Sequence, residues 1–474
     1  MTAALALKCQ INFKSQFDRK HYFYHDLPAG YQLTQKFQPI ATDGQLALDT
    51  KVIRIRQLHL EQDTARTLVS TDELTSDNTT TKIDLNRAGA PLIEIVTDPD
   101  FNHADDVVAF LCELQAILRT LDVSKASMDD GCFRVDVNVS VHTSDTDPGV
   151  RTELKNLASL RVIKDALDYE IQRHHRLISG ENEDGDVLVP ATRSFDAAAG
   201  RTLHLRLKET DLDYRYFPDP DLPPLRLRAD HVDRLRAGMP ELPQDRRSRF
   251  HREYGLSDHH IRILCSDHRV ASYFEQVVRH LQDVKAPEAS QTKTNAQTAS
   301  NWLTNTLFGV LTQRELNLFP SSSSSSDPVV SADQLASVIQ AVQQHRMATH
   351  QGKAWLEHVL DHPYAKLEDA LLGKTGFQVG FIEAELLKEH VREVARSNPK
   401  GIAQLGGRFP GGAGDNDMKK KVKLKPAVLT WFAGQVMRRI GGQADPDQLK
   451  TVLRQIFCEE YQVPMSVFEQ WDKK

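Results

Sequence analysis

Apolar and polar positions follow two different periods along this chain, and the change between them divides the sequence. Before about residue 285, short apolar runs with a period of two predominate, bounded by proline, aspartate and glycine, which is typical of strands. Two stretches in this part, 104–121 and 157–178, carry apolar residues at helical spacing instead. Later helical patterns cover residues 335–343, 381–395, 426–440 and 446–457. The sequence therefore predicts an α+β fold: a largely antiparallel, β-rich domain with flanking helices, followed by all-α domains.

Composition indicates where the domains end. The residues from Ala286 to Ser300 are polar and small, and the serine run Ser321–Ser326 is typical of a flexible insertion. The glycine-rich segment Gly401–Gly414 has the composition of a hinge. We expect three domains: residues 1–285, residues 286–400 with the serine-rich insertion, and residues 401–474 as a C-terminal helical tail.

A carboxylate inside an apolar strand is the most informative local feature. The run Leu92-Ile93-Glu94-Ile95-Val96 is short and β-branched, and it follows a turn-forming Asn-Arg-Ala-Gly segment, so it predicts a strand. Alternation places Leu92, Glu94 and Val96 on one face and Ile93 and Ile95 on the other. A charged side chain in such a run is costly unless a cation, a metal or hydrogen-bond donors meet it. We therefore expect Glu94 to belong to a site.

Other predicted strands also present polar faces. Residues 133–141, FRVDVNVSV, and residues 203–209, LHLRLKE, alternate apolar and polar side chains, and residues 52–63 end in a polar sequence, HLEQD. One interpretation is a half-exposed antiparallel sheet whose polar face lies in water. The other is a sheet that combines carboxylates for a divalent metal with cations for phosphates.

Basic residues concentrate near the C-terminus. The cluster consists of Lys419, Lys420, Lys421, Lys423 and Lys425, and Arg438 lies in the predicted helix that follows. Such a charge run is typical of a solvated surface. The alternative is contact with RNA phosphates, which supplies affinity and position without sequence selectivity.

Composition and motifs exclude several classes of protein. The 474 residues include five cysteines without metal-like or redox-like spacing, so a reducing compartment is expected. No apolar run is long enough to cross a bilayer, so we expect no membrane partner. The formal net charge is −6, so any nucleic-acid contact must use local basic patches. The sequence lacks a GxxxxGK(S/T) phosphate loop and a dinucleotide fingerprint, so ATP use does not follow from a standard motif.

Several of these segments resemble one family. They are FDRKHYFYHDLPAGYQLTQ at 17–35, LHLEQDTAR at 58–66, DLNRAGAPLIEIVTDPD at 84–100, DGCFRVDVNVSV at 130–141, ELKNLASLRVIKDALDYE at 153–170 and KETDLDYRYFPDPDLPP at 208–224. The motifs are long, and the likeness extends over nearly the whole chain. The chain resembles the B subunits of the glutamyl-/aspartyl-tRNA amidotransferases, the GatB family, and their fungal-type mitochondrial form in particular.

The resemblance implies a ligase component that depends on ATP and Mg²⁺. In that family, the B subunit activates the γ-carboxylate of glutamate carried on tRNA(Gln) as an acyl phosphate, and ammonia then displaces the phosphate. The implied partners are an amidase that releases ammonia from glutamine, a small third protein of the complex, and tRNA(Gln) charged with glutamate. The implied β-rich domain is cradle-shaped, and the implied location is the mitochondrial matrix, although no transit peptide is recognisable.

The resemblance also implies roles for particular residues. Glu94 and Glu61 resemble catalytic metal ligands, and Gln62 stands where most relatives carry a further glutamate of the metal site. Arg206 and Lys208 resemble a basic strand near the nucleotide phosphates. The lysines between 419 and 425, together with Arg438, would hold the body of the tRNA.

One departure from the family leaves an alternative open. Relatives begin with a strand of the form GLEVHVQL that supplies further metal ligands, whereas the match here begins at Leu5–Asn12. We therefore expect part of the metal shell to be absent from this sequence. The alternative function is non-catalytic docking of tRNA and assembly of the complex.

Overall fold

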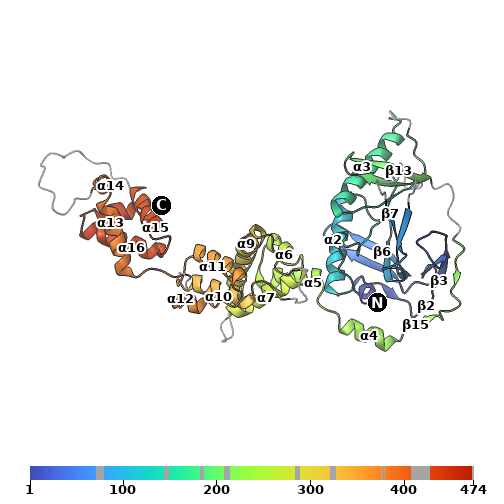
Figure 1. Cartoon of the computed structure of the whole chain (residues 1–474), viewed down its shortest axis with the longest axis horizontal. Coiled ribbons are helices and arrows are strands. Elements are labelled where there is room, and N and C mark those ends of the chain that lie inside the picture. The colour runs from blue at the N-terminus through green and yellow to red at the C-terminus, as the bar shows by residue number, and fades with distance from the viewer. Residues whose placement is uncertain are drawn as a thin grey trace. The chain divides into compact units, whose positions relative to one another are not determined.

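The structure, a computed structural model, describes residues 1–70, 80–142, 149–181, 186–207, 214–282, 289–320, 327–374, 377, 379–406 and 427–471. Contacts divide the chain into two compact units, Met1–Arg246 and Arg247–Lys474. The first unit contains the sheets and the second contains only helices among its described residues (Figure 1). The predicted α+β class is confirmed.

An antiparallel sheet forms the centre of the first unit. Its strands are β1 (Gln10–Ile11), β5 (Ala41–Ala47), β6 (Val52–Gln62), β4 (Tyr31–Thr34), β3 (Asp18–His21) and β14 (Phe217–Pro218), in that order. Strand β9 (Pro91–Thr97) also pairs with β6, in addition to the strands in this order. It is the strand that the sequence predicted around Glu94. Strand β6 is the longest and pairs with β4, β5 and β9, so its side chains set the geometry of the sheet.

Two helices cover the buried face of the first unit. Helix α2 (Ala104–Thr120) matches its predicted range, and helix α3 (Leu160–Ile178) begins a few residues later than predicted because the Ser159 side chain caps it. Figure 1 shows α2 beside β6 and α3 beside β13. The helices bury residues such as Phe110 and Ile163 in one core with Ile53, Ile55 and Leu58 of β6. The short helices α1 (Thr2–Ala6) and α4 (Ala229–Ala237) complete this unit.

A second sheet has the order β10 (Val137–Val139), β11 (Thr152–Lys155), β12 (Ala191–Asp196) and β13 (Arg201–Leu207). Only the β11–β12 pair is parallel. The expectation of a strand over the whole of 133–141 is wrong, because the ladder with β11 covers only residues 137–139 and its last pair is Val137 with Leu154. Two small ladders pair β7 (Arg66–Ser70) with β8 (Thr80–Asp84) and β15 (Leu225–Arg226) with β2 (Lys14–Ser15).

The second unit contains two hydrophobic cores. The first joins buried residues from Phe250 to Ala370, and the second joins buried residues from Leu387 to Phe468. Helices α6 and α7 belong to the first of these cores, so the division at Arg246 lies before the boundary expected near residue 285. The helices are α5 (Pro243–Arg249), η1 (Phe250–Tyr254), α6 (Asp258–Leu264), α7 (His268–Leu281), α8 (Ala289–Asn301), η2 (Trp302–Leu307), α9 (Phe308–Gln313), α10 (Ala332–Gln343), α11 (Thr349–Asp361), α12 (Leu367–Leu371), α13 (Ala384–Arg396), α14 (Pro399–Gln404), α15 (Ala427–Arg439), α16 (Pro446–Glu459) and α17 (Met465–Trp471).

The four helical patterns predicted beyond residue 332 correspond to α10, α13, α15 and α16. None of the helices in the described ranges has both the length and the apolar content that crossing a bilayer requires.

Candidate metal centre

Three side chains from two neighbouring strands converge on one point of the first unit. His59 and Glu61 lie on β6, and Glu94 lies directly opposite His59 on β9. The His59 Nε2 atom is 3.1 Å from a Glu94 carboxylate oxygen and 3.9 Å from a Glu61 carboxylate oxygen. One possible ligand atom from each residue lies within 4.8 Å of the others, so the three can share a single metal ion. We refer to these residues as the carboxylate–histidine cluster.

A β-bulge turns the cluster away from the core. Strand β6 buries Ile53 and Ile55 before the bulge and Leu58 after it, so its core-facing positions change from odd to even. The register with β9 shifts between Ile55 and Gln57, where β6 carries one extra residue. His59 and Glu61 therefore project from the face opposite the core.

Glu94 reaches the same face by simple alternation. Its strand neighbours Ile93 and Ile95 pack against the core, as the sequence predicted. The Glu94 side chain is 51% exposed, whereas the His59 side chain is only 5% exposed. The cluster is therefore closed on the sheet side and open on the side from which a ligand would approach.

The two carboxyl groups have opposite pKa shifts. Burial, together with the nearby charge of Glu94, raises the pKa of Glu61 to about 7. A hydrogen bond with His59 is the main reason that the pKa of Glu94 is lowered to about 2. Because like charges this close disfavour double ionisation, the pair holds one proton below about pH 7, and a bound cation would favour its release. This is the electrostatic pattern expected of a divalent-metal shell.

A glutamine side chain orients the histidine. The Gln57 side-chain nitrogen lies 3.2 Å from His59 Nδ1, which leaves Nε2 directed at Glu94. Because the amide nitrogen can only donate, Nδ1 accepts this hydrogen bond and Nε2 carries the proton that faces Glu94. A metal ion bound at Nε2 would replace that proton. Histidine nitrogen with two carboxylates is a donor set that suits Mn²⁺ as well as Mg²⁺. The residues present thus fit a divalent cation.

A cation lies beside the cluster. The Lys20 Nζ atom is 4.7 Å from the centre of the Tyr214 ring and 5.5 Å from that of Tyr22. Burial lowers the pKa of Lys20, and the charges of Glu61 and Glu94 partly offset this effect. Among the described residues, no carboxylate lies within ion-pair distance of the Lys20 ammonium group. It can therefore meet an incoming anion.

Comparison with known proteins gives this arrangement a family context. A family model described as the GatB/GatE catalytic domain matches residues 1–233. The aspartyl/glutamyl-tRNA(Asn/Gln) amidotransferase B subunit of Rhodopseudomonas palustris (strain HaA2) is 35% identical over 457 residues, which cover 95% of this chain and 84% of the relative. The protein with the same description from Symbiobacterium thermophilum is 35% identical over 466 residues, covering 97% and 87%. The one from Ehrlichia chaffeensis is 34% identical over 459 residues, covering 95% and 84%.

The chain belongs to the family of amidotransferase B subunits. The resemblance of the sequence motifs to the B subunits of the tRNA amidotransferases is thereby confirmed. In this family member, the structure brings together two of the three residues expected at the metal, Glu61 and Glu94. Gln62 follows Glu61 directly on β6, so its side chain leaves the strand on the opposite face. Its backbone carbonyl accepts a hydrogen bond from Gln32 instead.

The expected phosphate and tRNA residues lie elsewhere or outside the described residues. Arg206 belongs to β13, opposite Thr192 in the second sheet, and only its backbone is described. Lys208 and the lysines between 419 and 425 fall outside the described residues. Arg438 is exposed in the last turn of α15. Their roles therefore stay predictions.

Sequence reasoning missed His59, Gln57 and Lys20. In the sequence, His59 stands out only as part of a polar segment. The alternation Leu58-His59-Leu60-Glu61 nevertheless indicates that His59 and Glu61 share one face of the strand. The register that sets it opposite Glu94 could not be obtained from one strand alone, since it depends on the bulge.

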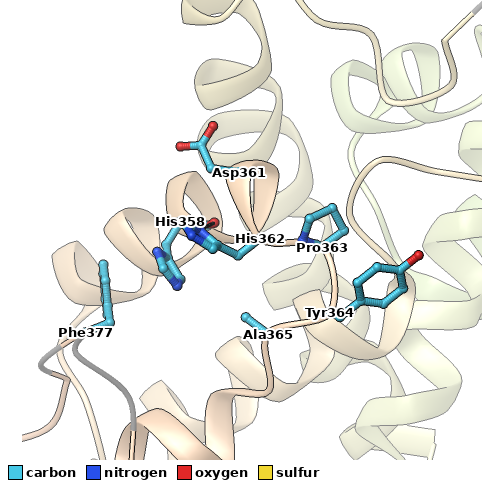
Figure 2. Close-up of a pocket in the computed structure, with 7 residues that line it drawn as sticks. All are labelled: His358, Asp361, His362, Pro363, Tyr364, Ala365 and Phe377. Atoms are coloured by element: carbon cyan, nitrogen blue, oxygen red, sulfur yellow. Dashed lines mark hydrogen bonds between the residues drawn. The ribbon is translucent and has the colours of Figure 1, made fainter.

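The second unit of this family member contains a separate pocket of about 670 Å³. His358 lies near the end of α11 and His362 directly follows that helix, and their stacked rings have centres 4.2 Å apart (Figure 2). The Phe377 ring is tilted against that of His358, with centres 4.7 Å apart. The lining is mainly apolar, and Tyr364 beside it is almost fully exposed. This pocket has no carboxylate–histidine cluster like that of the first unit among its lining residues.

Proposed function

We propose that this chain is the acyl-activating component of a tRNA amidotransferase that converts Glu-tRNA(Gln) to Gln-tRNA(Gln). Family membership supports the general role, since the relatives are described as B subunits of aspartyl/glutamyl-tRNA(Asn/Gln) amidotransferases. The observation that carries the proposal is the carboxylate–histidine cluster, with its coupled carboxyl groups and open side. The proposed cofactors are ATP and Mg²⁺, and the proposed partners are an amidase, a small third protein of the complex and the charged tRNA.

The proposed reaction has two steps. A γ-carboxylate oxygen of the tRNA-bound glutamate attacks the terminal phosphorus of ATP, which forms an acyl phosphate and releases ADP. Ammonia then attacks the acyl carbon, and inorganic phosphate leaves with the bonding electrons, so that an amide remains after loss of a proton. A divalent cation, when bound, would offset the charge that develops on the phosphoryl oxygens.

The residues of this chain contribute position and electrostatics to these steps. Glu61 and Glu94 would hold the cation, and His59 would be kept in place by Gln57. Lys20 would face the anionic reactants, held between two tyrosine rings rather than by a carboxylate. The half-exposed Glu94 marks the side from which the reactants would enter.

A single-turnover assay tests the proposal. The full chain, co-purified with its amidase partner, is mixed with glutamine, Mg²⁺, γ-labelled ATP and Glu-tRNA(Gln), and both labelled phosphate and Gln-tRNA are measured. Formation of Gln-tRNA in step with phosphate release is the expected result. If tRNA binds but neither product forms, the proposal is wrong for this chain, and a non-catalytic docking and assembly role is the better account.

A further inference from the structure

Two arginine side chains share one buried carboxylate just beyond the metal centre. Arg134 Nη2 lies 2.9 Å from both carboxylate oxygens of Asp63, and Arg87 Nη2 lies 3.1 Å from one of them. Asp63 is only 7% exposed, whereas the Arg87 and Arg134 side chains are 43% and 61% exposed. We refer to this arrangement as the arginine clamp.

The clamp has more positive charge than its carboxylate neutralises. Two guanidinium groups face one aspartate, so one formal positive charge is left over. Among the residues that the structure describes, Arg134 donates only through Nη2. Its remaining N–H groups are therefore available on the exposed side, in the planar fork geometry that matches phosphate oxygens.

Arg87 and the shared Asp63 carboxylate are fixed from outside the ion pairs. Arg87 Nη1 donates to the carbonyl oxygen of Gly131 at 3.0 Å, which links the turn before β9 to the loop before β10. The Asp63 carboxylate also accepts from the backbone N–H of Thr64. The Arg87 guanidinium group and the Asp63 carboxylate are thus held in place before any ligand arrives, which reduces the entropy lost on binding.

Two routes through the structure place the clamp beside the cluster. Asp63 directly follows the end of β6, two positions after Glu61, and its backbone continues the pairing with the other strand. In extended backbone, two positions correspond to about 7 Å and to the same face of the sheet. On the other side, Asp136 lies two positions beyond Arg134 and binds Lys155 at 2.6 Å. The positive charge of Lys155 contributes to lowering the pKa of Lys20, which lies beside the cluster.

We propose that the arginine clamp binds a phosphate group of the substrate whose reacting end lies at the carboxylate–histidine cluster. This inference rests on the proposed function. The shared ligand chemistry is a phosphate, and two substrates of that reaction could supply it: the polyphosphate of ATP or the phosphodiester of the tRNA acceptor end. Lys20, whose charge interacts with Glu61 and Glu94, would contribute a further positive charge to the same anion.

Binding measurements on the full chain test the proposal. Magnesium ATP and a short acceptor-stem RNA ending in CCA are titrated separately into the wild type and into R87Q, R134Q and R134K. The matched control is R56Q, because Arg56 is an equally exposed arginine paired with an aspartate, Asp98, at the bulge of β6. Mn²⁺ binding to each protein, followed by electron paramagnetic resonance, reports separately on the carboxylate–histidine cluster.

The expected result is that R87Q and R134Q weaken binding of one of the two probes roughly tenfold or more, because charge-assisted bonds are lost. R56Q should change it less than about twofold, and Mn²⁺ binding should be unaffected in all of these variants. R134K keeps a charge opposite Asp63 and so preserves folding, but it should still weaken binding because the fork is lost.

Two outcomes would overturn the inference, and each has a different meaning. If the wild type binds Mn²⁺ and either probe, but the arginine variants bind as tightly, the clamp is a structural ion pair only. If the wild type binds neither probe, the clamp assignment is wrong as well. Failure of the proposed function is distinguished by the assay for Gln-tRNA, in which an intact clamp can still bind phosphate without product.

Discussion

At the scale of single residues, the candidate metal centre consists of a few titratable side chains held close together on neighbouring strands. Glu61, Glu94 and His59 occupy consecutive outward positions of paired strands, and their mutual proximity raises one pKa and lowers another. Such opposed shifts are typical of functional sites, since folding alone gains nothing from an unneutralised pair of carboxyl groups.

Replacing Glu94 with glutamine should separate metal binding from folding. We expect E94Q to weaken Mn²⁺ and Mg²⁺ binding roughly tenfold or more, because a charged ligand becomes neutral, and to abolish Gln-tRNA formation. Binding of tRNA and the melting temperature should change little, since the side chain is half exposed. The control is D98N, which removes a carboxylate at the far end of the same strand pair. Equal loss of tRNA binding would indicate a structural role instead.

Gly131 provides a second test at this scale. It has a φ of +64°, and an added Cβ would lie 3.2 Å from Arg87 Nη1. Gly200 has a φ of +63° but nothing within 4 Å of its would-be Cβ. We expect G131A and G200A each to cost about 1 kcal/mol of unfolding free energy from backbone strain. Only G131A should also weaken phosphate binding, as measured by the ATP and RNA titrations; equal effects of both variants would contradict this.

At the scale of secondary-structure elements, a buried charge network joins α3 to the second sheet. Glu170 is fully buried and accepts hydrogen bonds from Arg173 and from the Thr202 hydroxyl, with Arg193 at 3.6 Å. Although burial opposes ionisation, the bonds with His174 and Arg173 lower the pKa of Glu170 to about 2. The ionised carboxylate therefore belongs to the stable state, as expected of a paired buried charge.

The Glu170 network should give stability a defined pH dependence. Because the folded pKa is below the ordinary value, its contribution is present above about pH 4.5 and is lost as pH falls toward 2. The full effect is on the order of 3 kcal/mol. Urea unfolding should show E170Q much less stable than the wild type at pH 7, with a smaller difference near pH 3. D165N, an exposed position on the same helix, should change stability by under about 0.5 kcal/mol at both pH values.

The sequence predicts an element well where the local spacing of apolar residues determines it. It predicts an element poorly where pairing with a distant strand determines its length or register. Helix α2 was predictable because its apolar spacing alone decides which face is buried. The strand expected over 133–141 is shorter in the structure, because its pairing with β11 covers only residues 137–139. Glu94 was found because a charge in an apolar run is locally anomalous. Its partner His59 was not, because cross-strand register is a property of two strands and a bulge.

At the scale of the whole molecule, the chain consists of two units with separate cores. The metal centre and the arginine clamp both lie in the first unit, whereas the second contributes only helices among the described residues. The carboxylate–histidine cluster and the larger helical surfaces are therefore encoded in different parts of the sequence.

This organisation predicts separable stability. A fragment of residues 247–474 should fold alone and melt cooperatively, because its two cores use no residue of the first unit. In the full chain, saturating Mn²⁺ should raise the melting temperature of one transition only, since a ligand stabilises the unit to which it binds. Calorimetry with and without Mn²⁺ measures this. A shift of both transitions by the same amount, or an unfolded fragment, would show that the units are energetically coupled.

The bulge in β6 has a consequence for how the sequence of this strand can vary. Positions that require an apolar side chain are odd up to Ile55 and even from Leu58 onward. In a saturation scan, tolerance to polar substitution should therefore change parity at Arg56, and a one-residue deletion there should be more damaging than any single replacement nearby. The strand therefore has two alternating patterns of buried positions, one on each side of the bulge. The one extra residue at the bulge lets both patterns face the same hydrophobic core.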